Sequence, residues 1–292
     1  MPAHSSSTRF AYIALAAAGG LWGIGFLAGK IALRELGVAH MILYRLVFAS
    51  LGLLPAAILG GVRVRRQDWP ALGIAALLGV PVLFLVQFEG LDRTTVAHAS
   101  LMIAAAPMLL ALGGSLFAGE RLDGLGRAAV IASTVGAALI ALAAPAGGSQ
   151  GATLAGDLLV IASLIAATAW VLLSQRLMRR YTSGVVSCAV MMLGTLMLAV
   201  WVVAVHGLPP ARLATATWLA LASQGLLSTT CATLLWNWGV ARVPASRAGV
   251  FVNLEPVIGA VLGVTVLGET LGTLALVGGL LIVGAAFAIS RR

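Results

Sequence analysis

Charged residues are scarce in this sequence, and their scarcity excludes an ordinary soluble protein. Only 9% of the 292 residues are Asp, Glu, Lys or Arg, whereas soluble globular domains carry roughly 25%. Hydrophobic residues make up 61% of the chain, and the mean hydropathy is +1.06. Because such a chain cannot cover its own surface with polar groups in water, the composition predicts an integral membrane protein.

Histidine and cysteine are also few, which argues against metal and cofactor chemistry. The four histidines, at positions 4, 40, 98 and 206, form no HExxH or similar motif, so a membrane-embedded enzyme is the weaker interpretation. Cys188 and Cys231 lie in apolar runs and are interpreted as small buried hydrophobes rather than a disulfide or a metal site. No GxxxxGK[ST] loop is present to support ATP use. We therefore expect no metal and no cofactor.

What the sequence does contain is a series of long apolar runs. Several approach 20 residues, which lets a helix rising about 1.5 Å per residue cross a hydrocarbon core of roughly 30 Å. The fold class predicted is an all-α integral membrane protein with ten transmembrane helices. The predicted spans cover residues 10–33, 39–59, 71–90, 95–118, 127–144, 156–175, 185–205, 218–240, 245–267 and 273–290.

The few positive charges are divided unevenly between the predicted loops. With a cytoplasmic N-terminus, 13 of the 18 Lys and Arg residues fall on the cytoplasmic side and 4 on the opposite side, while Arg45 lies within a span. The cytoplasmic group comprises Arg9, Arg63, Arg65, Arg66, Arg121, Arg127, Arg176, Arg179, Arg180, Arg242, Arg247, Arg291 and Arg292; the opposite group comprises Lys30, Arg34, Arg93 and Arg212. This bias follows the positive-inside rule, accounts for the net charge of +9 without a nucleic-acid partner, and places both termini in the cytoplasm.

The stretch 90–140 is repeated 149 positions later, at 239–289. The aligned identities are Gly90 and Gly239, Arg93 and Arg242, Ala99 and Ala248, Pro107 and Pro256, Gly114 and Gly263, and the runs Gly119-Glu120-x-Leu122 and Gly268-Glu269-x-Leu271. Most fall on Pro, Gly and acidic residues, where chance agreement is least expected in a chain rich in Ala, Leu and Val. The repeat predicts one transmembrane domain over 1–292, built from two five-helix halves at 9–145 and 155–290.

Five spans per half is an odd number, so the second half is expected to enter the membrane upside down relative to the first. Two such inverted halves can rock about a central site, and exchanging their conformations exchanges inward-open and outward-open states. We therefore expect a cavity near the midplane, shared by the two halves.

Several short motifs resemble the EamA-type proteins of the drug/metabolite transporter superfamily. They are Leu21-Trp22-Gly23, Lys30 with Leu33-Arg34-Glu35-Leu36, Tyr44-Arg45, and Pro107 with Gly119-Glu120, echoed by Pro256 with Gly268-Glu269. The likeness covers nearly the whole chain. One departure is Gly37-Val38-Ala39, which replaces a proline often found after the first helix of the family.

The resemblance implies a ten-helix carrier that moves small metabolites without ATP. Within the superfamily the chain is similar to the YddG-type amino-acid exporters, which implies export of amino acids, aromatic and other apolar ones among them, across the bacterial inner membrane. The expected partners are a small-molecule substrate and the lipid bilayer, and we expect a monomer or a weak homo-oligomer.

Glu255 and two prolines are the most informative residues inside the predicted spans. Glu255 lies in the middle of the ninth span, where a carboxylate costs about 2.5–3.5 kcal/mol. It either meets a substrate ammonium or a coupling proton, or it is a structural acceptor for a neighbouring side chain. Pro107 and Pro256 each remove a helical hydrogen bond at matched depth, which predicts either a pair of hinges or a pair of static kinks, and we favour hinges.

Aromatic and amide side chains complete the candidate substrate site. Trp170 lies deep in the sixth span, so an interfacial aromatic belt does not explain it, and it matches the aromatic positions implied by the YddG-type resemblance. Asn253 precedes Glu255 by two residues and either binds an amino or carboxylate group or joins helices. The predicted substrate-binding residues are Trp22, Phe88, Met102, Trp170, Trp236, Asn253 and Glu255.

The remaining charges are assigned mainly to structure. Arg45 is expected to pair with Glu35 or a lipid phosphate, with attraction of a carboxylate substrate as a secondary role. Lys30 is expected to extend to the external surface. Glu120 and Glu269 are predicted to cap helix starts or hold loops.

Glycines recur at four-residue spacing in the first and ninth spans. The motifs are Gly19-x3-Gly23 and Gly259-x3-Gly263. Such small-xxx-small faces permit close helix crossing, so these glycines are assigned to packing rather than to chemistry.

The sequence thus predicts a secondary transporter that exports amino acids or related metabolites by alternating access. A rival interpretation keeps the fold and changes the cargo to drugs, sugars or nucleotide conjugates. Nucleotide cargo would need cavity cations, for which Arg45 and Lys30 are the few candidates. A membrane-embedded enzyme and a purely structural helical bundle are the two further interpretations, and neither gives Glu255 and the repeat a common purpose.

Overall fold

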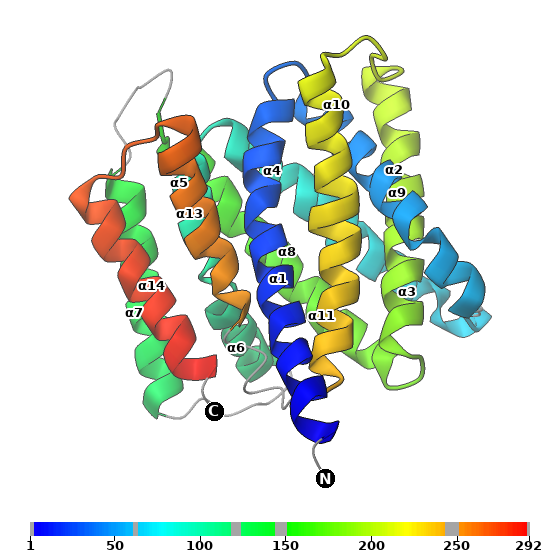
Figure 1. Ribbon diagram of the computed structural model, residues 1–292, viewed down its shortest axis with the longest axis horizontal. Helices are drawn as coiled ribbons and strands as arrows, with labels where there is room; N and C mark the ends of the chain where they lie inside the picture. Colours follow the sequence, from blue (N-terminus) through cyan, green and yellow to red (C-terminus); the bar gives the residue numbers. More distant parts are fainter. Residues whose placement is uncertain (1–2, 61–63, 118–123, 144–150, 243–250, 291–292) are drawn as a thin grey trace.

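The computed structural model describes residues 3–60, 64–117, 124–143, 151–242 and 251–290. Within these residues all regular secondary structure is helical, and the helices stand side by side in one bundle (Figure 1). Glu120, Arg247 and most of the joint between the two predicted halves lie outside the described residues.

The helices of the two predicted halves follow the same order along the chain. The first half contains α1 (Ala3–Ala32), α2 (Val38–Gly60), η1 (Arg66–Asp68), α3 (Trp69–Leu77), η2 (Leu78–Val82), α4 (Leu83–Asp92), α5 (Val96–Ile103), α6 (Ala106–Phe117) and α7 (Gly124–Ala143). The second half contains α8 (Leu154–Met178), α9 (Ser183–His206), α10 (Thr215–Ala222), η3 (Ser223–Cys231), α11 (Ala232–Val240), α13 (Leu254–Leu267) and α14 (Thr273–Ser290).

The described helices have the length and composition expected of a membrane protein. Six stretches are long and apolar enough to cross a membrane: Arg9–Ala32, Val38–Pro55, Arg66–Asp92, Leu154–Met178, Gly184–His206 and Thr215–Val240. Four shorter apolar helices coincide with the other predicted spans: Val96–Leu110, Gly124–Ile140, Leu254–Leu267 and Thr273–Ala285. The all-helical membrane architecture is confirmed, and the count of ten crossings remains a prediction.

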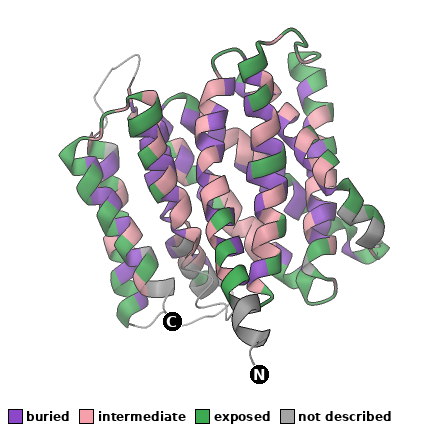
Figure 2. Ribbon diagram, viewed as in Figure 1, coloured by how far each residue is buried: buried purple, intermediate pink, exposed green. Residues whose placement is uncertain are grey.

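Large apolar side chains are exposed on the outer faces of the bundle, shown in green in Figure 2. Examples come from both halves: Leu142 on α7, Ile165 on α8, Val200 on α9, Leu219 on α10 and Leu280 on α14. An apolar surface this extensive is unfavourable in water and suits the acyl chains of a bilayer.

The fourth and ninth predicted spans are interrupted at matched positions. A turn at Ala104 and Ala105 separates α5 from α6, and a turn at Asn253 precedes α13. Pro107 and Pro256 then stand in the first turns of α6 and α13, where a missing backbone N–H costs no helical hydrogen bond. The predicted loss of a hydrogen bond in the middle of a helix was therefore wrong: the helix is instead broken just before each proline, and a hinge motion there remains a prediction.

The third and eighth predicted spans each contain a π-helical segment, η2 and η3. At the repeat offset of 149 residues, η2 corresponds to positions 227–231, the last part of η3. Short π-helical segments are rare and are often found at functional sites. Nothing in the apolar pattern of these spans predicted them.

One end of the bundle gathers four chain connections, and we call it the Lys30 end. The Lys30 Nζ donates to the carbonyls of Leu91 (2.6 Å) and Thr94 (2.8 Å), which joins the end of α1 to the α4–α5 connection. The Thr153 hydroxyl, at the start of α8, donates to the Arg93 carbonyl at 2.5 Å. The α13–α14 connection lies here too, because Glu269 accepts from the Val96 N–H at 2.8 Å.

The other end, which we call the Asp68 end, joins the α2–α3 connection to the α8–α9 connection. Arg180 Nη1 donates to Asp68 Oδ1 and the Tyr181 hydroxyl donates to Asp68 Oδ2, both at 2.6 Å. The N-terminus and the C-terminus both lie at this end in Figure 1.

Contacts between helices recur when each helix is replaced by its counterpart in the other half. α7 packs on α14 and α2 packs on α9, and each of these pairs joins a helix to its own repeat counterpart. The contact of α4 with α8 is matched by that of α11 with α1, and the contact of α6 with α8 by that of α13 with α1. Swapping the halves therefore turns each of these contacts into another observed contact.

The close approach of α1 to α13 depends on small residues. A Cβ atom added at Gly23 would lie 2.8 Å from the Glu255 carbonyl oxygen, and one added at Gly259 would overlap the Ser100 side chain. The packing role predicted for these glycines is confirmed.

Candidate functional site

Arg45 on α2 is the buried cation around which the interior polar groups are arranged. Its side chain is largely enclosed, and its Nε donates to the Thr229 hydroxyl at 3.3 Å. The guanidinium carbon lies 4.3 Å from the ring centre of Phe84 and 5.2 Å from that of Phe88. The expected partner Glu35 instead accepts from the Ala214 N–H, so the predicted pairing of Arg45 with Glu35 was wrong.

The π-helical segment η3 explains how a hydroxyl reaches Arg45. Thr229 donates to the carbonyl of Gln224, five residues earlier, at 2.9 Å, so the hydroxyl partners a carbonyl of the widened turn. Gln224 Nε2 in turn donates to the Gly25 carbonyl on α1 at 2.9 Å. The segment is thus fixed against α1 while its threonine faces α2. A Ser228-Thr229-Thr230 run inside an apolar span was the sequence signal for this arrangement.

Glu255 is the second residue of α13 and follows the helix break at Asn253. Its carboxylate and the Arg45 guanidinium interact electrostatically, yet the described residues contain no direct ion pair between them. A carboxylate in the first turn of a helix is stabilised by the helix dipole. Glu255 is partly buried as a whole residue.

Asn253 is buried at the break itself. Its Nδ2 has no hydrogen-bond partner among the described residues. A buried amide donor without a partner costs on the order of 1–3 kcal/mol, so this group is available to a ligand or a solvent molecule.

Trp22 on α1 and Trp236 on α11 form an aromatic pair. Their ring centres lie 5.3 Å apart with an interplanar angle of 48°, and both side chains are half-buried. Trp22 adjoins Gly23, whose backbone abuts the Glu255 carbonyl. Trp236 also packs on Ala11 and Leu15 of α1, so the described contacts of the pair join α1 to α11.

Phe88 and Met102 are enclosed in the core, each with 1% of its surface exposed. Phe88 stacks on Phe26, with ring centres 6.1 Å apart, and also supports Arg45. Met102 lies on α5 just before the break at Ala104.

Trp170 stands apart from the other candidates. It packs on Gly79 of η2, where an added Cβ would overlap the indole ring. Its Nε1 is buried and has no hydrogen-bond partner among the described residues. The contacts thus join Trp170 to the π-helical segment of the first half rather than to Arg45 and Glu255.

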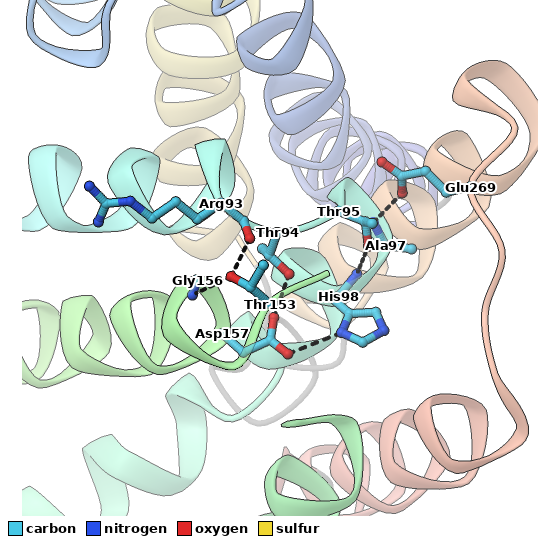
Figure 3. Close-up of polar contacts among 9 residues, drawn as sticks. All are labelled: Arg93, Thr94, Thr95, Ala97, His98, Thr153, Gly156, Asp157 and Glu269. Carbon is cyan, nitrogen blue, oxygen red and sulfur yellow. Dashed lines mark hydrogen bonds and ion pairs between the residues drawn. The ribbon is translucent and has the colours of Figure 1, made fainter. Parts of the chain in front are cut away.

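A second polar cluster lies at the Lys30 end (Figure 3). Asp157, on α8, is fully buried; it accepts from the Thr94 hydroxyl at 2.5 Å and lies 3.1 Å from His98 Nδ1. Glu269 accepts from the first two N–H groups of α5, at Val96 and Ala97, which confirms its predicted capping role. Asp157 was not identified from the sequence, although an acidic residue four positions after Thr153 at a span start was the available signal.

Pockets open at both ends of the bundle. The pocket at the Lys30 end has a volume of about 730 Å³ and borders Lys30, Arg34, Arg93 and Glu269, among others. The pocket at the Asp68 end has a volume of about 550 Å³ and borders Asp68, Arg176, Arg179 and Arg180, among others. The cavity expected near the midplane remains a prediction.

The comparison with known families decides what this bundle is. A model of the EamA-like transporter family matches residues 9–142 and again residues 154–291. The chain belongs to the EamA-like transporter family. The resemblance predicted from its short motifs is confirmed.

Individual relatives of this EamA-like transporter agree over nearly its whole length. It is 32% identical over 274 residues to a protein of Streptantibioticus cattleyicolor named "Probable terminal-alkyne amino-acid exporter", with 93% of this chain and 90% of that protein covered. An "Uncharacterized transporter" of Archaeoglobus fulgidus is 25% identical, with 93% and 94% covered. A protein of known crystal structure, 23% identical, shares the fold with a TM-score of 0.63 over 98% of this chain and 96% of that one.

Family membership and the apolar helices together make this EamA-like protein a multi-pass membrane transporter with a small-molecule substrate.

Proposed function

We propose that the protein exports amino acids, aromatic and other apolar ones among them, by alternating access around an interior site. The observation that carries the proposal is the 32% identity, over 93% of this chain, to a relative whose name describes an amino-acid exporter. The residue types inside the bundle support it, because Trp22 and Trp236 offer an apolar surface and Arg45, Asn253 and Glu255 offer polar groups.

The proposed site comprises the seven residues predicted from the sequence. Asn253 and Glu255 stand at the start of α13, Trp22 pairs with Trp236, and Phe88 lies against Arg45. In the proposed site the substrate contacts all of them. Met102 and Trp170 would join when the breaks and π-helical segments around them rearrange, because both flank such irregular backbone.

The proposed mechanism uses two inverted halves, at 9–145 and 155–290. The start of α8 lies at the Lys30 end, whereas the chain enters α1 from the Asp68 end, so corresponding first helices run in opposite directions. The exchange of helix pairs described above and the twofold match of the family model support the same arrangement.

The proposed hinges are the breaks before Pro107 and Pro256. A helix that is already interrupted can change direction without losing further hydrogen bonds, and both breaks lie at the same depth of the repeat. Hydrogen bonds of Glu269, Asp157 and Lys30 close the Lys30 end, and we propose that such a movement breaks them.

We place the Asp68 end and both termini in the cytoplasm and the Lys30 end outside. The excess of arginines in the loops of the Asp68 end supports this orientation in the bacterial inner membrane. A cationic drug is the rival cargo for the same fold, and Arg45 opposes it by charge repulsion.

Proteoliposomes test the cargo. Purified protein is reconstituted into vesicles loaded with a radiolabelled amino acid, and efflux is compared with that from protein-free vesicles, with and without a proton gradient. We expect efflux of leucine and phenylalanine above the protein-free rate. If the vesicles release a cationic dye but no amino acid, the cargo is a cationic drug and the proposed amino-acid cargo is wrong.

A further inference from the structure

We propose that Arg45 and Glu255 form a two-point receptor for a zwitterion, in which Arg45 binds the carboxylate of the cargo and Glu255 binds its ammonium group. The inference rests on the proposed function, because it concerns the same interior site, and it assigns each charge of the cargo to one residue.

Arg45 is held in a geometry suited to a carboxylate. Its Nε is already bonded to Thr229, and its guanidinium lies over the rings of Phe84 and Phe88, which fix its plane. Its two Nη atoms have no hydrogen-bond partner among the described residues. These are the atoms that bind the two oxygens of a carboxylate in a forked pair.

Glu255 presents the complementary group. No described residue donates a hydrogen bond to its carboxylate or forms a direct ion pair with it, although it interacts electrostatically with Arg45. In the proposed receptor the cargo lies between Arg45 and Glu255 and carries both charges in the reverse order. An α-amino acid carries them on one carbon atom.

Asn253 adds a third contact. Its buried Nδ2 lacks a partner among the described residues, and it stands at the helix break two residues before Glu255. An amide donor beside the Arg45 fork supplies a further hydrogen bond to the carboxylate. The equivalent of Glu255 in the first half is Ala106, so the receptor belongs to one side of the repeat only.

The two charges together select against singly charged molecules. An amine meets Glu255 but is repelled by Arg45, and a carboxylic acid meets Arg45 but is repelled by Glu255. In a low-dielectric interior these repulsions are large. A zwitterion satisfies both residues, with its side chain toward Trp22 and Trp236.

The test compares leucine with two analogues that each lack one charge, isopentylamine and 4-methylpentanoate. Each competes with radiolabelled leucine in proteoliposomes, and each is also tested for thermal stabilisation of the purified protein. The wild type should bind leucine at least about tenfold more tightly than either analogue.

The two charge-removing variants should then change selectivity in opposite ways. In Arg45→Gln, leucine should bind no better than isopentylamine, because the carboxylate has lost its partner. In Glu255→Gln, leucine should bind no better than 4-methylpentanoate. Arg45→Lys keeps the positive charge but loses the forked pair of N–H donors. It should therefore weaken the binding of leucine and of 4-methylpentanoate and leave the binding of isopentylamine unchanged. Arg242→Gln, at an exposed arginine over Trp238, is the control and should match the wild type.

The outcomes separate this inference from the proposed function. The receptor is overturned if the wild type exports leucine but both variants lose affinity equally for all three ligands. Arg45 and Glu255 would then have a purely structural role. Reciprocal selectivity in the thermal assay without any efflux would keep the receptor and overturn export. If the wild type neither binds nor exports leucine, both the receptor and the proposed export are overturned. If Arg45→Gln does not fold, Arg45→Lys and Glu255→Gln still give the decisive comparison.

Discussion

At the scale of single residues, the interior of this transporter differs from its surface in having polar groups with few partners. Arg45, Asn253 and Glu255 each keep at least one polar atom without a hydrogen bond among the described residues. Uncompensated polar groups at membrane depth are costly and are retained mainly where they meet a substrate or ion. The pair of Trp22 and Trp236 is the proposed apolar counterpart.

Tryptophan substitutions on α11 test the aromatic wall. Trp236 contacts Trp22, whereas Trp238, two residues further, is 40% exposed. Trp236→Ala should raise the KM for phenylalanine efflux about three- to tenfold, because an aromatic contact contributes about 0.5–1.5 kcal/mol beyond its buried area. Trp238→Ala should leave KM unchanged. An equal effect of the two substitutions in the proteoliposome assay would contradict the assignment.

A glycine substitution tests the crossing of α1 and α13. A Cβ at Gly23 would meet the Glu255 backbone, while one at Gly73 on α3 would meet no atom within 4 Å. Gly23→Val should destabilise the protein by about 1–3 kcal/mol through overpacking, and Gly73→Val should have little effect. Thermal unfolding in detergent measures the difference, and equal melting temperatures for the two variants would refute the crossing.

At the scale of elements, irregular backbone is concentrated where the halves meet. The breaks before α6 and α13 and the π-helical segments η2 and η3 occupy matched positions in the repeat. Their side chains reach the candidate residues: Thr229 of η3 contacts Arg45, and Gly79 of η2 contacts Trp170. The proposed site thus combines residues of continuous helices, such as Trp22 on α1 and Arg45 on α2, with residues at the interrupted ones.

The closure at the Lys30 end gives an element-scale prediction. Ser100 on α5 is fully buried below Glu269, which holds the start of that helix. In a background lacking Cys188 and Cys231, Ser100→Cys should resist a membrane-impermeant maleimide, and adding Glu269→Ala should expose it by loosening the closure. Glu89→Ala, which removes only an exposed ion pair with Arg93, is the control and should leave labelling low. Equal labelling with and without Glu269 would argue against a gate there.

The sequence predicted the parts of this structure that follow from composition and repetition. Apolar length located the helices, glycine spacing located the α1–α13 crossing, and the paired prolines located the helix breaks. The sequence did not place Arg45, because its partners Thr229, Phe84 and Glu255 come from three other helices and only the fold brings them together. The π-helical segments were missed because a one-residue widening of a turn leaves the apolar pattern unchanged. The pairing of Asp157 with His98 was missed for the same reason as Arg45.

At the scale of the whole molecule, the account depends on two halves of opposite orientation. The hydrogen bonds at each end assign chain connections to the Lys30 end or the Asp68 end, and corresponding connections of the two halves fall at opposite ends. Only that relation lets one half adopt the conformation of the other and so open the site to the other side of the membrane.

Sidedness of one position near each of two corresponding connections tests this relation most directly. Gly37 follows the first helix of the first half and Gly184 follows the first helix of the second half, and a Cβ at either would meet no atom within 4 Å. With the native cysteines removed, Gly37→Cys and Gly184→Cys are treated in intact cells with an impermeant maleimide, then again after permeabilisation. The inverted arrangement predicts labelling of Gly37→Cys from outside and of Gly184→Cys only after permeabilisation. Labelling of both from the same side would contradict it.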